Sequence, residues 1–156
     1  MNVRAYLQTR TAREPVPAIG WAIREGRAMA AAVREWSAGE RRLIRLVEHR
    51  LRAPWGHCFG SAQRATLLAE ALGTGRHEFV YCEGFASTPD LPAPFAHAWC
   101  LLNGQVWDPT PQFRELRVEY FGREITTAYL RRAVARRQAW GPVMLSPLPP
   151  VLPPTG

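Results

Sequence analysis

The sequence predicts an α+β fold in which helices come first and pack on a small antiparallel sheet. Up to residue 72 the hydrophobic residues recur at the spacing of a helix, whereas residues 79–108 read as strands around one tight turn. The chain has 156 residues, 47% hydrophobic and 21% charged, as is typical of a globular unit with a single core. We therefore expect one domain over residues 1–141 and an extended or disordered tail over residues 142–156, which hold six prolines.

Two helices are predicted within residues 18–52, after an irregular start that ends in two prolines. The first covers about residues 18–36, and its buried stripe is expected to contain Ala22, Met29, Val33 and Trp36. Ser37 and Glu40 then have the spacing of a capping box, in which the serine caps the helix and the glutamate reaches back. The helix that they open places four hydrophobic residues on one face: Leu43, Ile44, Val47 and Leu51.

A third helix is predicted over residues 58–72, with Gly73 as its C-terminal stop. Three strands and a closing helix are predicted beyond it, at about residues 79–85, 97–102, 105–108 and 125–138. The two later strands flank an Asn-Gly dipeptide, the strongest short-range signal for a hairpin. The proline-rich loop at residues 87–94 comes directly before the first of these two strands, so we expect the loop to border the substrate cleft.

The charge pattern limits the classes of partner. All 20 basic residues are arginine and the formal net charge is +7, with the excess in residues 1–52 and 114–156. These arginines alternate with glutamates and form no recognisable nucleic-acid-binding motif, so a solvated helix surface is favoured over nucleic acid binding. The first residues lack the apolar region of a signal peptide, and no apolar run approaches the ~20 residues of a membrane helix. With three cysteines that cannot all pair, a cytoplasmic location is expected.

Cys58 is the first candidate for chemistry, since it lies in the first turn of a predicted helix. There the helix dipole and the unpaired N–H groups would stabilise a thiolate, and the same N–H groups could hold an oxyanion. The alternative is a buried, inert cysteine, because Cys58 shares its helix face with Ala62 and Ala65.

The predicted hairpin supplies a partner for this cysteine. A two-residue turn pairs Cys100 with Trp107, which makes Asp108 the diagonal neighbour of His97 on one face of the sheet. A carboxylate orients an imidazole, which can then take the proton of a thiol. The alternative for Asp108 is a turn residue before a proline, and a slip of one residue in register would separate the pair.

The remaining histidines and cysteines do not form a metal-binding pattern. His97 and Cys100 lie three apart on a strand and point to opposite faces, and His77 and Cys82 lack the repeated spacing of a zinc site. We therefore expect neither a structural metal nor a cofactor. His57 could cap the helix or line the site, and the sequence does not distinguish these two roles.

Four short motifs follow one another in the chain: Cys58 at a helix start, Glu83-Gly84-Phe85 at the end of an extended segment, His97-Ala98-Trp99 on a strand, and Asp108-Pro109-Thr110 after a hairpin. This set resembles the compact bacterial members of the transglutaminase-like superfamily, which share a rearranged papain-like fold. The resemblance covers about residues 55–112 and extends loosely to the later Tyr-Phe-Gly segment.

The resemblance implies a Cys58, His97 and Asp108 triad that carries out acyl transfer on an amide through a thioester. Hydrolysis of a peptide or isopeptide bond in a peptide or protein substrate is the leading expectation, and Trp55, His57 and Trp99 are assigned to substrate binding. No cluster of acidic residues suggests a calcium site. The alternative is a transglutaminase-like module without catalysis that binds an acidic partner or nucleic acid through its arginine-rich helices.

Overall fold

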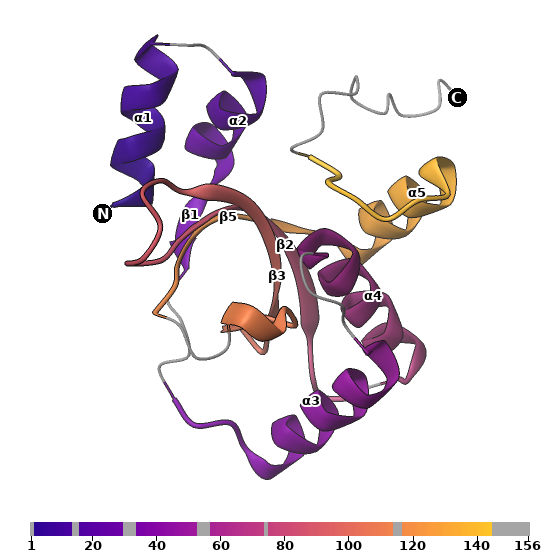
Figure 1. Ribbon diagram of the computed structural model, residues 1–156. Helices are drawn as coiled ribbons and strands as arrows, with labels where there is room; N and C mark the ends of the chain where they lie inside the picture. Colours follow the sequence, from indigo (N-terminus) through magenta and orange to yellow (C-terminus); the bar gives the residue numbers. More distant parts are fainter. Residues whose placement is uncertain are drawn as a thin grey trace.

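The computed structural model describes residues 2–13, 16–29, 34–52, 57–73, 75–113 and 117–144 (Figure 1). Its helices are α1 (Val3–Arg13), α2 (Pro17–Glu25), α3 (Ala38–Leu51), α4 (Cys58–Ala71) and α5 (Thr127–Arg137). Its strands are β1 (Arg27–Met29), β2 (Phe79–Ser87), β3 (Phe95–Leu102), β4 (Gln105–Trp107) and β5 (Glu119–Ile125), and a short 3₁₀ helix covers Pro111–Phe113. The predicted α+β class is confirmed.

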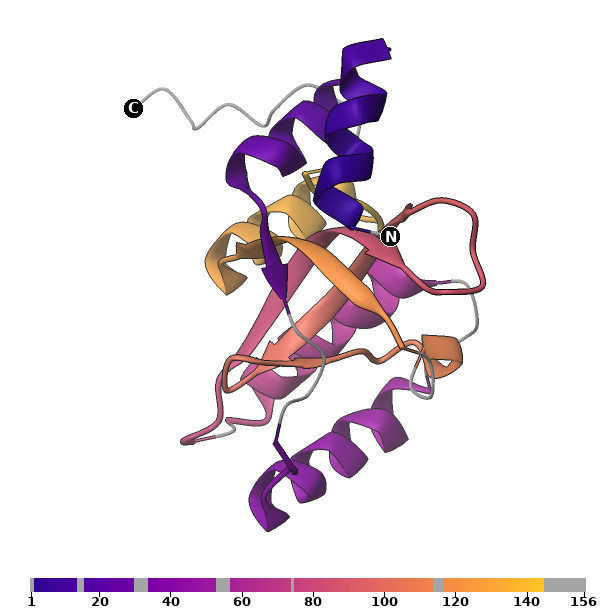
Figure 2. The same ribbon diagram turned by 90° about the vertical axis from the view of Figure 1, so that its left-hand side faces the viewer.

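The strands form one antiparallel sheet in the order β1-β5-β2-β3-β4. Figures 1 and 2 show α1 and α2 beyond one end of this curled sheet and α3 towards the other, with α4 lying along the strands. The main core lies where α3, α4 and α5 meet the sheet, and it includes Val47, Ala65, Cys100, Leu102 and Leu130. Side chains on the other face of the sheet form a second core around Met29, Trp99 and Tyr120.

Two glycines allow β2 and β5 to approach closely. Gly84 lies opposite Gly122 in the register, and a Cβ on either would fall far inside contact distance of a main-chain oxygen on the facing strand. A Cβ on Gly122 would also lie 2.6 Å from Cη2 of Trp99. The missing side chain at this position therefore makes room for the Trp99 ring, which matters for the site below.

Several sequence predictions are confirmed. Ser37 and Glu40 form the capping box of α3, with both reciprocal hydrogen bonds present. The Asn-Gly turn has positive φ at both residues, 50° at Asn103 and 79° at Gly104, as a two-residue hairpin of type I′ requires. On α3 the side chains of Leu43, Val47 and Leu51 are buried, as the helical spacing predicts.

The prediction of one helix over residues 18–36 is wrong, because α2 ends at Glu25 and β1 follows. Gly26 adopts an extended conformation and the next residues pair with β5, about 95 positions later, so a distant strand overrides the local helical period. Met29 is buried, as the period predicted, but on a strand. Val33, placed on the same stripe, lies outside the described residues.

Both ends of the chain also differ from expectation. The supposedly irregular start contains α1, which buries Val3 and Leu7. Ile125, assigned to the last helix, ends β5, and Thr126 caps α5. The β5 strand itself was not predicted, because the only signal there was the short Tyr-Phe-Gly segment.

Candidate active site

The β3–β4 hairpin brings His97 and Asp108 together. Its register pairs Cys100 with Trp107 and Leu102 with Gln105, as the sequence predicted. As a result, Nε2 of His97 lies 2.6 Å from Oδ2 of Asp108. Both side chains are buried, with 1% and 4% of their surfaces exposed. The predicted histidine–carboxylate pair is therefore present.

Asp108 is held by two further donors. The backbone N–H of Thr110 donates to Oδ1 at 2.8 Å, and the Tyr120 hydroxyl donates to Oδ2 at 3.0 Å. Both carboxylate oxygens therefore have partners, and Oδ2 accepts from two directions. This network fixes the orientation of the carboxylate and, through it, that of the His97 ring.

Cys58 begins α4 and approaches the same imidazole. Its thiol is half-buried and acts on His97 strongly enough to contribute to the pKa of that ring. Nδ1 of His97, the nitrogen that Asp108 does not use, is buried and makes no hydrogen bond within the described residues. In the first turn of α4 the backbone N–H of Ser61 bonds the His57 carbonyl, whereas the preceding N–H groups have no acceptor within the helix. The arrangement offers a thiol, a base and donors for an oxyanion at one place.

The protonation of His97 follows from these neighbours. Burial of the ring is the largest single influence and lowers its pKa. The hydrogen bond to Asp108 and the interactions with Cys58 act in the opposite direction and together outweigh burial, raising the pKa of His97 to about 9. At neutral pH the ring is therefore an imidazolium, held between a carboxylate and a thiol.

Aromatic side chains enclose the imidazole. Trp99 stacks beside His97 with ring centroids 6.2 Å apart, and Phe113 meets the ring edge-on at 4.7 Å. The ring centroids of Tyr120 and Trp99 are 4.9 Å apart, and the Tyr120 hydroxyl reaches Asp108. Burial raises the pKa of the Tyr120 hydroxyl well above its usual range, which keeps it protonated as a donor. The sequence analysis gave Tyr120 no role, because β5 was not predicted.

The three residues assigned to substrate binding have different outcomes. Trp99 has no exposed surface and donates its indole N–H to the sulfur of Met29, so it supports the histidine instead of offering a contact surface. His57 is exposed at the N-cap of α4 and its side chain makes no capping hydrogen bond. Trp55 lies outside the described residues.

The other two cysteines are strand residues, as expected. Cys82 and Cys100 are fully buried, and burial raises the pKa of both thiols, that of Cys100 to about 12. Within the described part of the chain, no group of three or more His, Cys, Asp or Glu side chains could hold a metal ion.

A buried polar cluster anchors the segment after α5. The Glu83 carboxylate accepts hydrogen bonds from the backbone N–H groups of Val143 and Met144, and from the Tyr81 hydroxyl at 2.6 Å. The Gln63 side chain brackets Gly141, donating to its carbonyl at 2.6 Å and accepting from its N–H at 3.2 Å. The predicted tail at residues 142–156 therefore begins with a docked segment, and its remainder from residue 145 lies outside the described residues.

This docked segment passes beside the first turn of α4. A Cβ on Gly60 would lie 3.1 Å from Cβ of Trp140, so the two backbones approach closely there. Trp140 itself is 49% exposed. Its ring is therefore a candidate border of the approach to Cys58, two residues before Gly60, and no sequence motif indicated it.

Fold and site together define an α+β chain with a buried histidine–aspartate pair beside a cysteine at a helix start. No protein-family model, curated protein or solved structure matches the chain. Among the described helices, none combines the length and apolarity needed to cross a membrane.

Proposed function

We propose that the chain is a transglutaminase-like cysteine amidase in which Cys58, His97 and Asp108 form the triad. The observation that carries the proposal is the His97 ring, which is hydrogen-bonded to a fixed carboxylate on one side and influenced by the Cys58 thiol on the other. A carboxylate, an imidazole and a thiol in this order are the components of nucleophilic acyl transfer. The resemblance of the motifs around residues 55–112 supports the same assignment.

The proposed reaction begins from an ion pair in which His97 has already taken the proton of Cys58. The sulfur then bonds to the carbonyl carbon of an amide, while backbone N–H groups in the first turn of α4 stabilise the oxyanion. The C–N bond breaks, and the amine leaves with the proton from His97. Water next attacks the thioester, the C–S bond breaks, and the acid and the free thiol are released. An amine in place of water gives transamidation, and hydrolysis of a peptide or isopeptide bond is the leading outcome.

The proposal is tested by comparing how fast the three cysteines of this chain are alkylated. Iodoacetamide labelling at pH 6, 7 and 8, mapped separately for each cysteine, compares Cys58 with the buried Cys82 and Cys100. A thiolate paired with an imidazolium reacts well below pH 7, whereas an ordinary thiol titrates near ~8.5. We expect Cys58 to be labelled at pH 6 and the two strand cysteines to stay unmodified, which also reports that the fold is intact.

The histidine variants identify the base. His97→Ala should abolish the reaction of Cys58 at pH 6, whereas the matched control His49→Ala, an exposed residue on α3, should not change it. With p-nitrophenyl acetate as substrate, Cys58 should become acetylated, and the acetyl group should be hydrolysed with repeated release of p-nitrophenol, only when His97 is present. Equal labelling of Cys58 in both variants would refute the triad and leave an interaction module without catalysis as the better explanation.

A further inference from the structure

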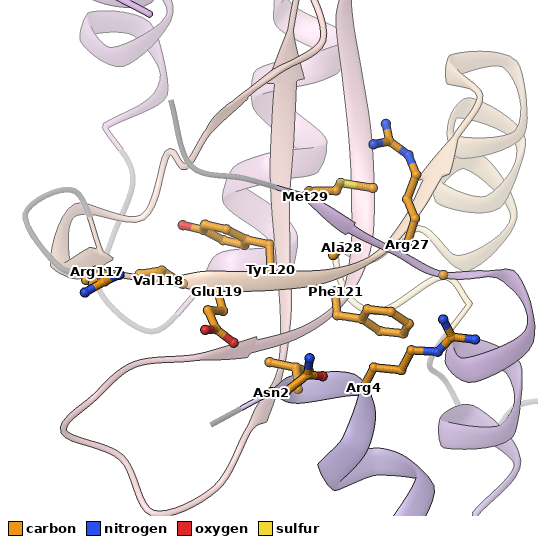
Figure 3. A pocket seen from close by; sticks show the side chains of 12 residues that line it. Asn2, Arg4, Arg27, Ala28, Met29, Arg117, Val118, Glu119, Tyr120 and Phe121 are labelled. Atoms are coloured by element: carbon orange, nitrogen blue, oxygen red, sulfur yellow. The ribbon is translucent and has the colours of Figure 1, made fainter. Parts of the chain in front are cut away.

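A pocket of about 810 Å³ lies where the start of α1 meets β1 and β5 (Figure 3). Its volume falls in the range of ligand sites, which are mostly apolar with a few placed polar groups. Val3, Met29, Val118 and Phe121 supply buried apolar side chains to its wall. A second cavity of about 300 Å³, under Ser87, Thr88 and Pro89, shares Arg117 and Glu119 with it. Residues 87–94, the loop that the sequence analysis expected beside the substrate cleft, begin at this second cavity.

The charge of the pocket is positive and is spread along its length. Three arginines and one glutamate line it, and Figure 3 shows Arg117 at the opposite end from Arg4 and Arg27. Arg4 and Arg117 are exposed and form no ion pair with any other described residue. Arg27 is paired with Glu124, but both side chains are about half exposed, so this pair is weak and can rearrange. Cations at two ends suit an elongated ligand with separated negative charges better than one compact anion.

The backbone beside the pocket offers a further means of recognition. β1 is the terminal strand of the sheet and pairs only with β5 among the described strands. An edge strand has N–H and C=O groups that point away from its partner, and an extended peptide can pair with them. Arg27 and Ala28 of this strand are exposed and line the pocket.

We propose that this pocket binds an extended peptide segment with acidic side chains. Its arginines would pair with the acidic groups, its apolar wall would accept the alternate side chains, and β1 would pair with the backbone. Glu119 and the apolar wall disfavour a nucleic acid, which carries a phosphate at every step. Tyr120 lines the pocket and donates to Asp108, so a bound peptide lies one side chain from the candidate triad. The proposal does not depend on turnover at Cys58.

The test measures binding in the Cys58→Ser chain, so that failure of the proposed reaction leaves the result interpretable. The probe is a fluorescein-labelled hexapeptide of alternating glutamate and valine, compared with its glutamine–valine counterpart by fluorescence anisotropy. We expect the acidic probe to bind more tightly and its affinity to fall with added salt. The double variant Arg4→Gln/Arg117→Gln should weaken binding about tenfold, as the loss of two exposed ion pairs predicts.

A charge-matched control separates the pocket from the general positive charge. Arg42→Gln/Arg132→Gln removes two exposed arginines on α3 and α5 and should change affinity less than twofold. The backbone N–H groups of an extended probe point alternately to its two edges, and only one edge can face β1. N-methylation of the odd-numbered residues and N-methylation of the even-numbered residues are therefore compared, and only one of the two modified probes should bind more weakly. The proposal is overturned if neither peptide binds, if both bind with equal affinity, or if both double variants lose affinity equally. It is also overturned if an oligothymidylate binds more tightly than the acidic peptide and its binding depends on Arg4 and Arg117.

Discussion

The raised pKa of His97 makes the stability of the protein depend on pH in a defined window. The pKa lies at about 9 in the folded chain, compared with the ordinary 6.5. The folded state therefore binds the proton more tightly than the unfolded state. This contribution to the free energy of unfolding is fully present below pH 6.5 and is lost as the pH rises to about 9. The difference corresponds to about 3 kcal/mol, at 1.36 kcal/mol for each pKa unit, and the ring is fully buried, so solvent does not screen it.

Urea unfolding followed by tryptophan fluorescence at pH 6.0, 7.5 and 9.0, under reducing conditions, measures this contribution. The matched variant His97→Gln lacks the titrating ring, so the difference between wild type and variant isolates it. We expect the wild type to lose about 3 kcal/mol more than the variant across this range. Identical pH dependence in the two proteins would refute the reasoning.

Asp108→Asn should lower the pKa of His97 from about 9, because the hydrogen bond and the charge of Asp108 both raise it and burial is then opposed by Cys58 alone. The loss of stability between pH 6.5 and 9 should therefore be smaller than in the wild type. The C–H signals of the histidine ring, followed by NMR, measure this fall in pKa without unfolding the protein.

Two further substitution pairs test particular contacts. Tyr120→Phe and Tyr81→Phe each remove a hydroxyl that donates to a buried carboxylate, and each should cost about 1.5–3 kcal/mol in urea unfolding. Only Tyr120→Phe should also slow the alkylation of Cys58, and equal effects of both variants would show that the tyrosine acts through stability alone. Gly122→Ala should cost about 3 kcal/mol because its Cβ meets the facing strand and Trp99. Gly20→Ala in α2, where a Cβ meets only the end of the Arg24 side chain at 3.4 Å, should stabilise the protein by about 0.5–1 kcal/mol. A matching loss for both glycines would contradict the close-approach argument.

Local chemistry made part of this fold readable from the sequence. The capping box at Ser37 and the Asn-Gly turn depend on a few neighbouring residues, and both were predicted at the right positions. The turn then fixed the register of the hairpin, because the side chains of a strand alternate with a period of two. The pairing of His97 with Asp108 followed from that register alone, over a separation of 11 residues.

Contacts between distant segments were not readable in this way. β1 and β5 are three and seven residues long, and the strand character of β1 comes from its pairing with β5 at the other end of the chain. Tyr120 reaches Asp108 only because β5 lies beside β2, and the Glu83 carboxylate finds its backbone donors in a segment 60 residues later. No local period or motif encodes such contacts, because many partners are compatible with a short strand.

The sequence by itself determined the α+β class, a helix that begins at Cys58, and the hairpin that joins His97 to Asp108; the helix was predicted over residues 58–72 and covers Cys58–Ala71. The tertiary structure alone decided that Trp99 is buried behind the histidine and that Tyr120 holds its carboxylate. It also created the pocket between α1, β1 and β5. The physical reason is that propensity, capping and turn chemistry act over a few residues, whereas the packing that assembles a site depends on which faces of the sheet the helices cover.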